Sequence, residues 1–178
     1  MPSHTISVLV ENEFGVLARV SGLFSSRGFN IESLTVNEDP LDPTVSRIVL
    51  VASGDDQTLE QINKQLNKLV CVIRVTDFKD TSTIDREMVM VKVSVDERTR
   101  AELDSIVAAF RAHVIDIGPR AVTVEVTGDA DKIKAFIELV RPLGIKEIVR
   151  SGKIAMARAV QTAQHETNPR AAATREAG

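Results

Sequence analysis

The sequence predicts an α+β protein built from two tandem βαββαβ units, and three observations support this prediction. Over the first eighty residues, the spacing of apolar side chains switches between the period of a strand and that of a helix in the order βαββαβ. The same order recurs after the polar segment 79–85, "KDTSTID". A chain of 178 residues, 43% of them hydrophobic and 26% charged, is long enough for two small globular domains.

The first unit begins with a strand and a helix. Apolar side chains alternate along residues 6–10, "ISVLV", as they do in a half-buried strand. From Val16 onward they fall at helical spacings, and Arg27 and Gly28 provide a cation and a flexible residue where the helix should end.

Two strands, a second helix and a fourth strand complete the first unit. Branched residues fill 29–36, "FNIESLTV", and 45–53, "VSRIVLVAS", and the two prolines between these segments prevent continuous pairing, so we expect a hairpin with a long loop. After "SGDD", apolar residues at positions 59, 62, 66 and 69 predict a helix, and residues 70–78, "VCVIRVTDF", predict a strand.

The second unit repeats this order without convincing residue identity to the first. Alternating valines at 89–95 predict a strand, and helical stripes at 103–110 and 133–140 predict two helices, the second with Asp129 as its N-cap. Segments 113–118, 121–128 and 145–149 complete the set as strands. We therefore predict domains at residues 1–80 and 86–158 with a linker at 81–85. Residues 159–178 contain almost no large apolar side chain, so we expect a disordered tail there.

Composition excludes several classes of protein. The net charge of -3 argues against a nucleic-acid binder, and a single cysteine, Cys71, excludes an intrachain disulfide. The N-terminus has neither a basic region nor an apolar run long enough for a signal peptide or membrane span, so we expect a cytoplasmic protein. RNA-recognition modules share the βαββαβ order, but they need aromatic rings on their central strands, and "ISVLV" and "SRIVLVAS" have none.

No catalytic or metal-binding motif can be assembled. His4, His113 and His165 are scattered, and their spacing with Cys71 matches no zinc or redox motif, so Cys71 is most simply a core residue. Neither GxxxxGK[ST] nor GxGxxG occurs. We therefore expect a protein that is not an enzyme.

The polar segment between the first strand and the first helix is the strongest candidate site. A helix that begins near Gly15 presents N–H groups without backbone partners and a partial positive charge, which suits a carboxylate such as that of an amino acid. Asn12 could cap the helix or offer its amide to a ligand, Gly15 permits close approach, and Val16 and Leu17 could supply N–H groups.

A second polar residue, Asn30, begins the next strand and could face the helix start of a neighbouring copy if two chains paired edge to edge. Asparagine and glycine are also ordinary turn residues, so the local pattern alone leaves a simple turn as the alternative.

Several long segments resemble the regulatory small subunits of acetohydroxyacid synthase, also called acetolactate synthase. They include "ISVLVENEFGVLARVSGLFSSRGFNIESLTV", "DPTVSRIVLV", "REMVMVKV", "AFRAHVIDIGPRAVTVEVTG" and "RSGKIAMAR", and the similarity extends to about residue 158. The resemblance implies two ferredoxin-like domains, of which the first is an amino-acid-binding ACT domain.

The resemblance also implies a function. Such a subunit is not catalytic itself; it activates a separate catalytic subunit and confers feedback inhibition by valine in branched-chain amino-acid biosynthesis. The catalytic partner uses thiamine diphosphate, Mg²⁺ and FAD, so we expect no cofactor on this chain. The effector lies at the interface of a homodimer or larger assembly, and by position the resemblance assigns it to Asn12, Gly15, Val16, Leu17, Asn30 and Ile31.

Two other functions are compatible with the same fold. A stand-alone ACT-type amino-acid sensor could control another enzyme or transcription, but the second half of the chain has no recognisable DNA-reading helix or basic cluster. A small enzyme on this frame has the least support, because no proton-transfer pair can be named.

Overall fold

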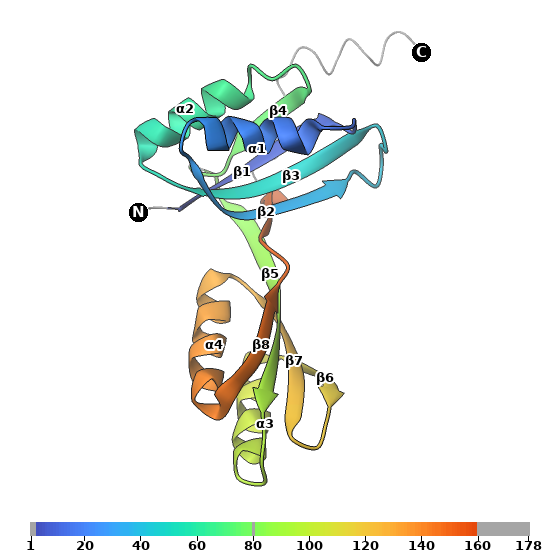
Figure 1. Ribbon diagram of the computed structural model, residues 1–178, viewed down its shortest axis with the longest axis vertical. Helices are drawn as coiled ribbons and strands as arrows, with labels where there is room; N and C mark the ends of the chain where they lie inside the picture. Colours follow the sequence, from blue (N-terminus) through green and yellow to red (C-terminus); the bar gives the residue numbers. More distant parts are fainter. Residues whose placement is uncertain (1–2, 80, 160–178) are drawn as a thin grey trace.

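The computed structural model describes residues 3–79 and 81–159, and it confirms the predicted α+β class with two tandem βαββαβ units. Figure 1 shows the units one above the other, joined through the long strand β5. The N-terminal unit contains β1 (Ser3–Glu11), α1 (Val16–Ser26), β2 (Asn30–Glu38), β3 (Val45–Ser53), α2 (Asp56–Leu66) and β4 (Val72–Asp77). The C-terminal unit contains β5 (Thr83–Ser94), α3 (Thr99–Phe110), β6 (His113–Ile117), β7 (Ala121–Gly128), α4 (Ala130–Gly144), β8 (Ile145–Arg150) and β9 (Ile154–Ala157).

The N-terminal sheet has the strand order β2-β3-β1-β4, and all its neighbouring strands are antiparallel. Helices α1 and α2 cover one face of it (Figure 1). Alternate residues of β1 and β3, such as Val8 and Leu50, meet the apolar side of α1 and α2 in one buried core. Cys71 is buried in that core, as the sequence predicted.

The C-terminal sheet has the equivalent order β6-β7-β5-β8, and α3 and α4 supply its core. The alternating valines of β5 are fully buried, and Phe136 of α4 packs edge-on against Phe110 with ring centroids 5.5 Å apart. Asp129 caps α4, because its Oδ1 accepts a hydrogen bond of 2.9 Å from the N–H of Lys132.

The join between the units differs from the predicted linker. Of residues 81–85, Thr83 to Asp85 belong to β5, and they pair with β9, a strand that the sequence did not predict. The pairing runs from Thr83 opposite Ala157 to Arg86 opposite Ile154. We call this two-stranded segment, residues 83–86 and 154–157, the ribbon. Of the predicted disordered tail, residues 160–178 lie outside the described residues.

The ribbon covers the face of the N-terminal sheet that points away from its helices. Val49 and Val51 alternate with core residues of β3, so they point to that face, yet they are only 5% and 6% exposed. Val49 and the ribbon residues Ile84 and Ile154 line a common groove of about 260 Å³. The two units therefore meet at this face.

Within the part of the chain that the structure describes, no helix is long and apolar enough to cross a membrane.

Candidate functional site

The corner between β1 and α1 is shaped by Gly15. Helix α1 begins at Val16, and Gly15 occupies the N-cap position with φ +81° and ψ 0°, in the left-handed region that favours glycine. A Cβ atom at this position would meet no heavy atom within 4 Å. Backbone conformation, rather than crowding within the protomer, therefore favours glycine at this position.

The start of α1 presents free donors. The first bond of the helical pattern runs from the N–H of Arg19 to the carbonyl of Gly15 at 3.0 Å, so the N–H groups of Leu17 and Ala18 precede it. No side chain of the described residues caps this end of the helix. The N–H of Val16 makes only a long contact of 3.4 Å with the carbonyl of Glu13. These donors, with the positive end of the helix dipole, can receive a carboxylate.

Asn12 has a different local role from the capping that the sequence suggested. Its Nδ2 donates to the carbonyl of Pro43 at 3.0 Å and to Oε2 of Glu38 at 3.3 Å, and its backbone N–H donates to the carbonyl of Thr44 at 2.7 Å. The helix-capping alternative is therefore wrong. Asn12 instead attaches the corner to the loop that joins β2 and β3.

That loop is itself ordered by local hydrogen bonds. Oδ1 of Asp42 accepts from the N–H of Thr44 at 2.9 Å and from its hydroxyl at 2.6 Å. The Thr44 hydroxyl and amide hold the pKa of Asp42 below its ordinary value. The loop that Asn12 contacts is thus held in place by its own hydrogen bonds, without a ligand.

The predicted site residues form two separate groups in one protomer. Asn12, Gly15, Val16 and Leu17 lie at the N-terminal end of α1, whereas Asn30 and Ile31 begin β2, after the helix has ended. Eleven helical residues span about 16 Å. Figure 1 shows the two groups at opposite ends of α1. A single chain therefore does not bring these six residues together.

The side chains of the two groups differ in exposure. Val16 is buried in the core, whereas Leu17 is 43% exposed. Asn30 is exposed and Ile31 is half-buried. Phe14, whose side chain is fully exposed, projects from the corner beside them. The surface therefore presents two separate features: the free N–H groups at the start of α1 and the Asn30 amide at the start of β2.

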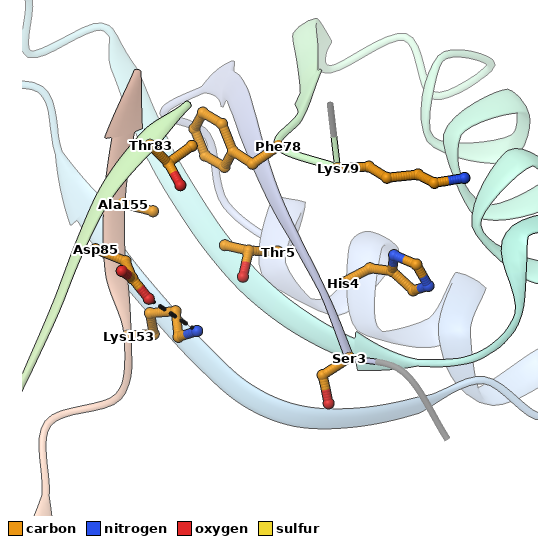
Figure 2. A pocket seen from close by; sticks show the side chains of 9 residues that line it. All are labelled: Ser3, His4, Thr5, Phe78, Lys79, Thr83, Asp85, Lys153 and Ala155. Atoms are coloured by element: carbon orange, nitrogen blue, oxygen red, sulfur yellow. Dashed lines mark ion pairs between the residues drawn. The ribbon is translucent and has the colours of Figure 1, made fainter. Parts of the chain in front are cut away.

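A cavity of about 380 Å³ lies at the boundary of the units, but the polar side chains that line it do not point toward a common centre. In Figure 2, His4 and Lys79 point away from the ion pair that Lys153 forms with Asp85. The His4 ring is hydrogen-bonded to the carbonyl of Gly54 at 3.0 Å, and Nζ of Lys79 lies 2.7 Å from Oδ1 of Asp56. Across the described residues, no group of three or more His, Cys, Asp or Glu side chains could hold a metal ion.

Comparison with protein families gives matches to both units. Residues 6–74 match the model described as the AHAS small subunit-like ACT domain. Residues 86–159 match the model described as the small subunit of acetolactate synthase. Together the two models account for nearly all of the described chain.

Individual relatives agree with these models. A probable acetolactate synthase small subunit from Methanothermobacter thermautotrophicus is 51% identical over 161 residues, which cover 90% of this chain and 95% of that protein. The acetolactate synthase small subunit from Mycobacterium bovis is 46% identical over 156 residues, covering 88% and 92%. The crystal structure of the small subunit from Thermotoga maritima superposes with a TM-score of 0.79 at 41% identity, covering 89% of this chain and 98% of that one.

Proposed function

Because this chain belongs to the family of acetolactate synthase small subunits, we propose that it regulates a separate catalytic subunit, raising its activity and making it sensitive to inhibition by valine. The catalytic subunit carries thiamine diphosphate, Mg²⁺ and FAD, and this chain carries only the effector. The complex acts in the cytoplasm, in branched-chain amino-acid biosynthesis.

The observation that carries the effector proposal is the separation of the six site residues into two groups. β2 is an edge strand, because among the described strands it pairs with β3 alone. If two copies pair through β2 about a two-fold axis, the strands run antiparallel, and the start of one β2 meets the end of the other. Asn12 joins the corner to Glu38, the last residue of β2. In such a pair, the corner of one copy would face Asn30 and Ile31 of the other.

A zwitterionic amino acid with a branched side chain fits this pair of groups. Its carboxylate would accept hydrogen bonds from the N–H groups of Leu17 and Ala18 at the helix start. Its apolar side chain would contact Leu17 and the partner's Ile31, and the Asn30 amide oxygen can accept a bond from the ammonium group. Each copy supplies half of the contacts, so the proposed site requires at least a homodimer.

The extent of the family match favours a regulatory subunit over a stand-alone sensor. An ACT domain alone is compatible with either function. Here the second unit also matches a model specific to acetolactate synthase small subunits, over residues 86–159. That match supports a dedicated catalytic partner.

Reconstitution tests the proposal. The full-length chain is mixed with the catalytic subunit, and acetolactate formation is measured with and without valine, with aspartate as a control amino acid. We expect a higher rate on addition of this chain and inhibition by valine only. An unchanged rate with no valine effect would refute the proposed function. Light scattering should give at least twice the 19.4 kDa protomer mass, and a monomer would exclude the shared effector site.

A further inference from the structure

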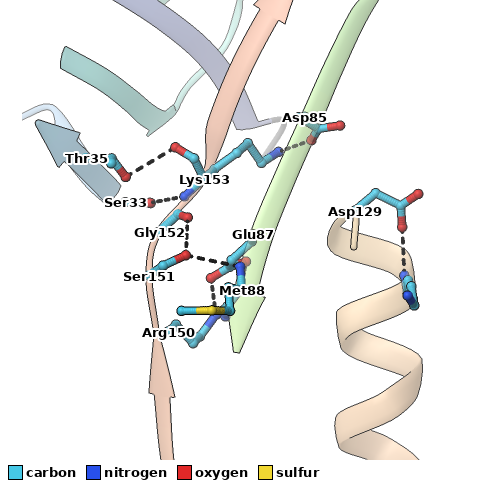
Figure 3. A network of polar contacts seen from close by, with 11 residues as sticks. Ser33, Thr35, Asp85, Glu87, Met88, Asp129, Arg150, Ser151, Gly152 and Lys153 are labelled. Atoms are coloured by element: carbon cyan, nitrogen blue, oxygen red, sulfur yellow. Dashed lines mark hydrogen bonds and ion pairs between the residues drawn. The ribbon is translucent and has the colours of Figure 1, made fainter. Parts of the chain in front are cut away.

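Residues 151–153, which we call the strap, connect β8 to β9 and are firmly attached to β5. The N–H of Ser151 donates to the carbonyl of Met88 at 3.0 Å, and the Ser151 hydroxyl accepts from the N–H of Met88 at 3.1 Å. Nζ of Lys153 lies 3.0 Å from Oδ2 of Asp85 (Figure 3). Two hydrogen bonds and an ion pair therefore fix the strap to the C-terminal unit.

A charged pair reinforces this attachment where the strap begins. Arg150, the last residue of β8, donates from Nε and Nη2 to the two carboxylate oxygens of Glu87, each at 2.6 Å. The Glu87 side chain is buried, and this bidentate contact raises the pKa of Arg150 above its ordinary value. Hydrogen bonds between two ionised groups are stronger than hydrogen bonds between neutral groups.

The strap meets the N-terminal unit through two neutral hydrogen bonds to β2. Oγ of Ser33 accepts from the N–H of Lys153 at 3.2 Å, and Oγ1 of Thr35 donates to the carbonyl of Lys153 at 3.2 Å. Both bonds are made by the backbone of Lys153, so the strap meets β2 at a single residue. The attachment of the strap to β5 adds an ion pair and the adjacent Arg150–Glu87 contact to two neutral bonds, so the contacts with β2 are easier to break.

Gly152 permits this close approach. Its φ is +83°, and a Cβ atom at this position would lie 2.7 Å from Oγ1 of Thr35 and 3.0 Å from Oγ of Ser33. Such distances are shorter than van der Waals contact. A side chain here would therefore displace either these hydroxyls or the strap, and either movement would disturb the two hydrogen bonds between them.

The strap contact lies next to the proposed effector residues on the same strand. Pairing of β2 with β3 shifts register between Ile31 and Ser33, so a bulge separates the effector end of β2 from the strap contact. Only Glu32 lies between them, and within residues 3–79 and 81–159 no strand other than β3 pairs with β2 to hold it in place. A displacement of Ile31 on ligand binding would reach Ser33 within two residues.

We propose that docking of the strap on Ser33 and Thr35 couples the effector site to the C-terminal unit. Valine at the start of β2 changes the strap contact, and the C-terminal unit, which holds the strap rigidly, conveys the change to the catalytic subunit. This inference rests on the proposed function, since it concerns regulation through the same site. A ligand can act in this way only if it binds the docked and undocked arrangements with different affinity.

Two strap variants test the coupling by different means. Ser33→Ala with Thr35→Val removes both hydroxyls, and Gly152→Ala adds the obstructing Cβ. A matched control, Ser94→Ala with Thr123→Val, removes two half-buried strand hydroxyls from the C-terminal sheet. Gly144→Ala controls for backbone strain, because Gly144 has φ +96° and its added Cβ would meet only Ser94 Cβ at 3.5 Å.

Each full-length variant is assayed by calorimetry with valine and by reconstitution with the catalytic subunit. We expect both strap variants to bind valine and to activate the catalytic subunit, while the valine concentration for half inhibition rises about tenfold or more. Both controls should behave as wild type. Circular dichroism checks folding, and if one strap variant does not fold, the other still decides the question.

The outcomes separate this inference from the proposed function. A strap variant with wild-type valine inhibition would refute the coupling. Loss of valine binding in both strap variants would also refute it, because Ser33 and Thr35 would then belong to the effector site itself. A wild-type protein that neither binds valine nor alters the catalytic rate would instead contradict the proposed function.

Discussion

Substitution of Gly15 by aspartate should abolish the response to valine while leaving a folded protein. In the proposed site, the new carboxylate lies beside the N–H groups that receive the carboxylate of valine. Two like charges about 5 Å apart repel by about 3 kcal/mol at an effective dielectric constant of about 20, which corresponds to more than a hundredfold loss of affinity.

The cost to the fold should be small by comparison. Gly15 has a φ of +81°, where a residue with a Cβ is strained, but the added Cβ would meet nothing within 4 Å. Asparagine and aspartate tolerate this region better than other residues, so we expect a loss of about 1 kcal/mol. For a chain of this size, that loss lowers the melting temperature by about 2–4 °C.

Gly15→Asn is the matched control, because asparagine has nearly the same size and backbone strain without the charge. Calorimetry should show much weaker valine binding for Gly15→Asp than for Gly15→Asn, and the reconstituted enzyme should lose valine inhibition but keep its activation. Equal effects of the two variants would show that size rather than charge matters. A folded Gly15→Asp protein with wild-type valine binding would refute the proposed position of the ligand carboxylate.

Three further predictions concern the fold. Phe136→Ala should lower the free energy of unfolding by about 3–5 kcal/mol in a denaturant titration, because Phe136 is fully buried. Phe14→Ala, at a fully exposed side chain, is the control, and comparable losses in the two variants would contradict the assigned core. Asp129→Ala should cost about 1 kcal/mol through loss of the α4 N-cap, whereas Asp131→Ala in the same first turn should cost less, and the reverse order would exclude the cap. The hydroxyls of Ser53 and Ser3 lower the pKa of Glu32, so the stability that Glu32 contributes is present above the ordinary carboxyl pKa and is lost as the pH falls through the lowered pKa. The difference in free energy of unfolding between wild type and Glu32→Gln should therefore shrink below about pH 4. A difference that grows in acid would contradict the direction of the pKa shift.

The sequence was sufficient where structure follows from local spacing. The alternation along β1, the helical stripe from Val16 and the cap at Asp129 each depend on residues within a few positions, and the structure confirms them. The recurrence of this pattern also predicted the second unit. Local periodicity and capping thus predicted the βαββαβ order of both units, but not β9.

The sequence was insufficient where a partner lies far along the chain. The sequence left Asn12 as either a helix cap or a ligand contact, and the capping alternative is wrong because the Asn12 amide donates to the carbonyl of Pro43, 31 residues away. The pairing of Thr83–Arg86 with β9 was missed for the same reason, since neither segment is long or strongly alternating. The positive φ of Gly15 could not be predicted, because glycine adopts both signs of φ readily. The six effector residues remain a prediction, because a second copy is needed to join them.

The ribbon has a consequence for biosynthesis. Every strand of the N-terminal sheet has been synthesised once Asp77 emerges from the ribosome, but Ile154, where β9 begins, follows 77 residues later. At about 5–20 residues per second, that interval is about 4–15 s. During this time the face bearing Val49 and Val51 has no cover from β9. The ACT domain can therefore fold before the strand that covers Val49 and Val51 exists, and these two valines are exposed to aggregation during that interval.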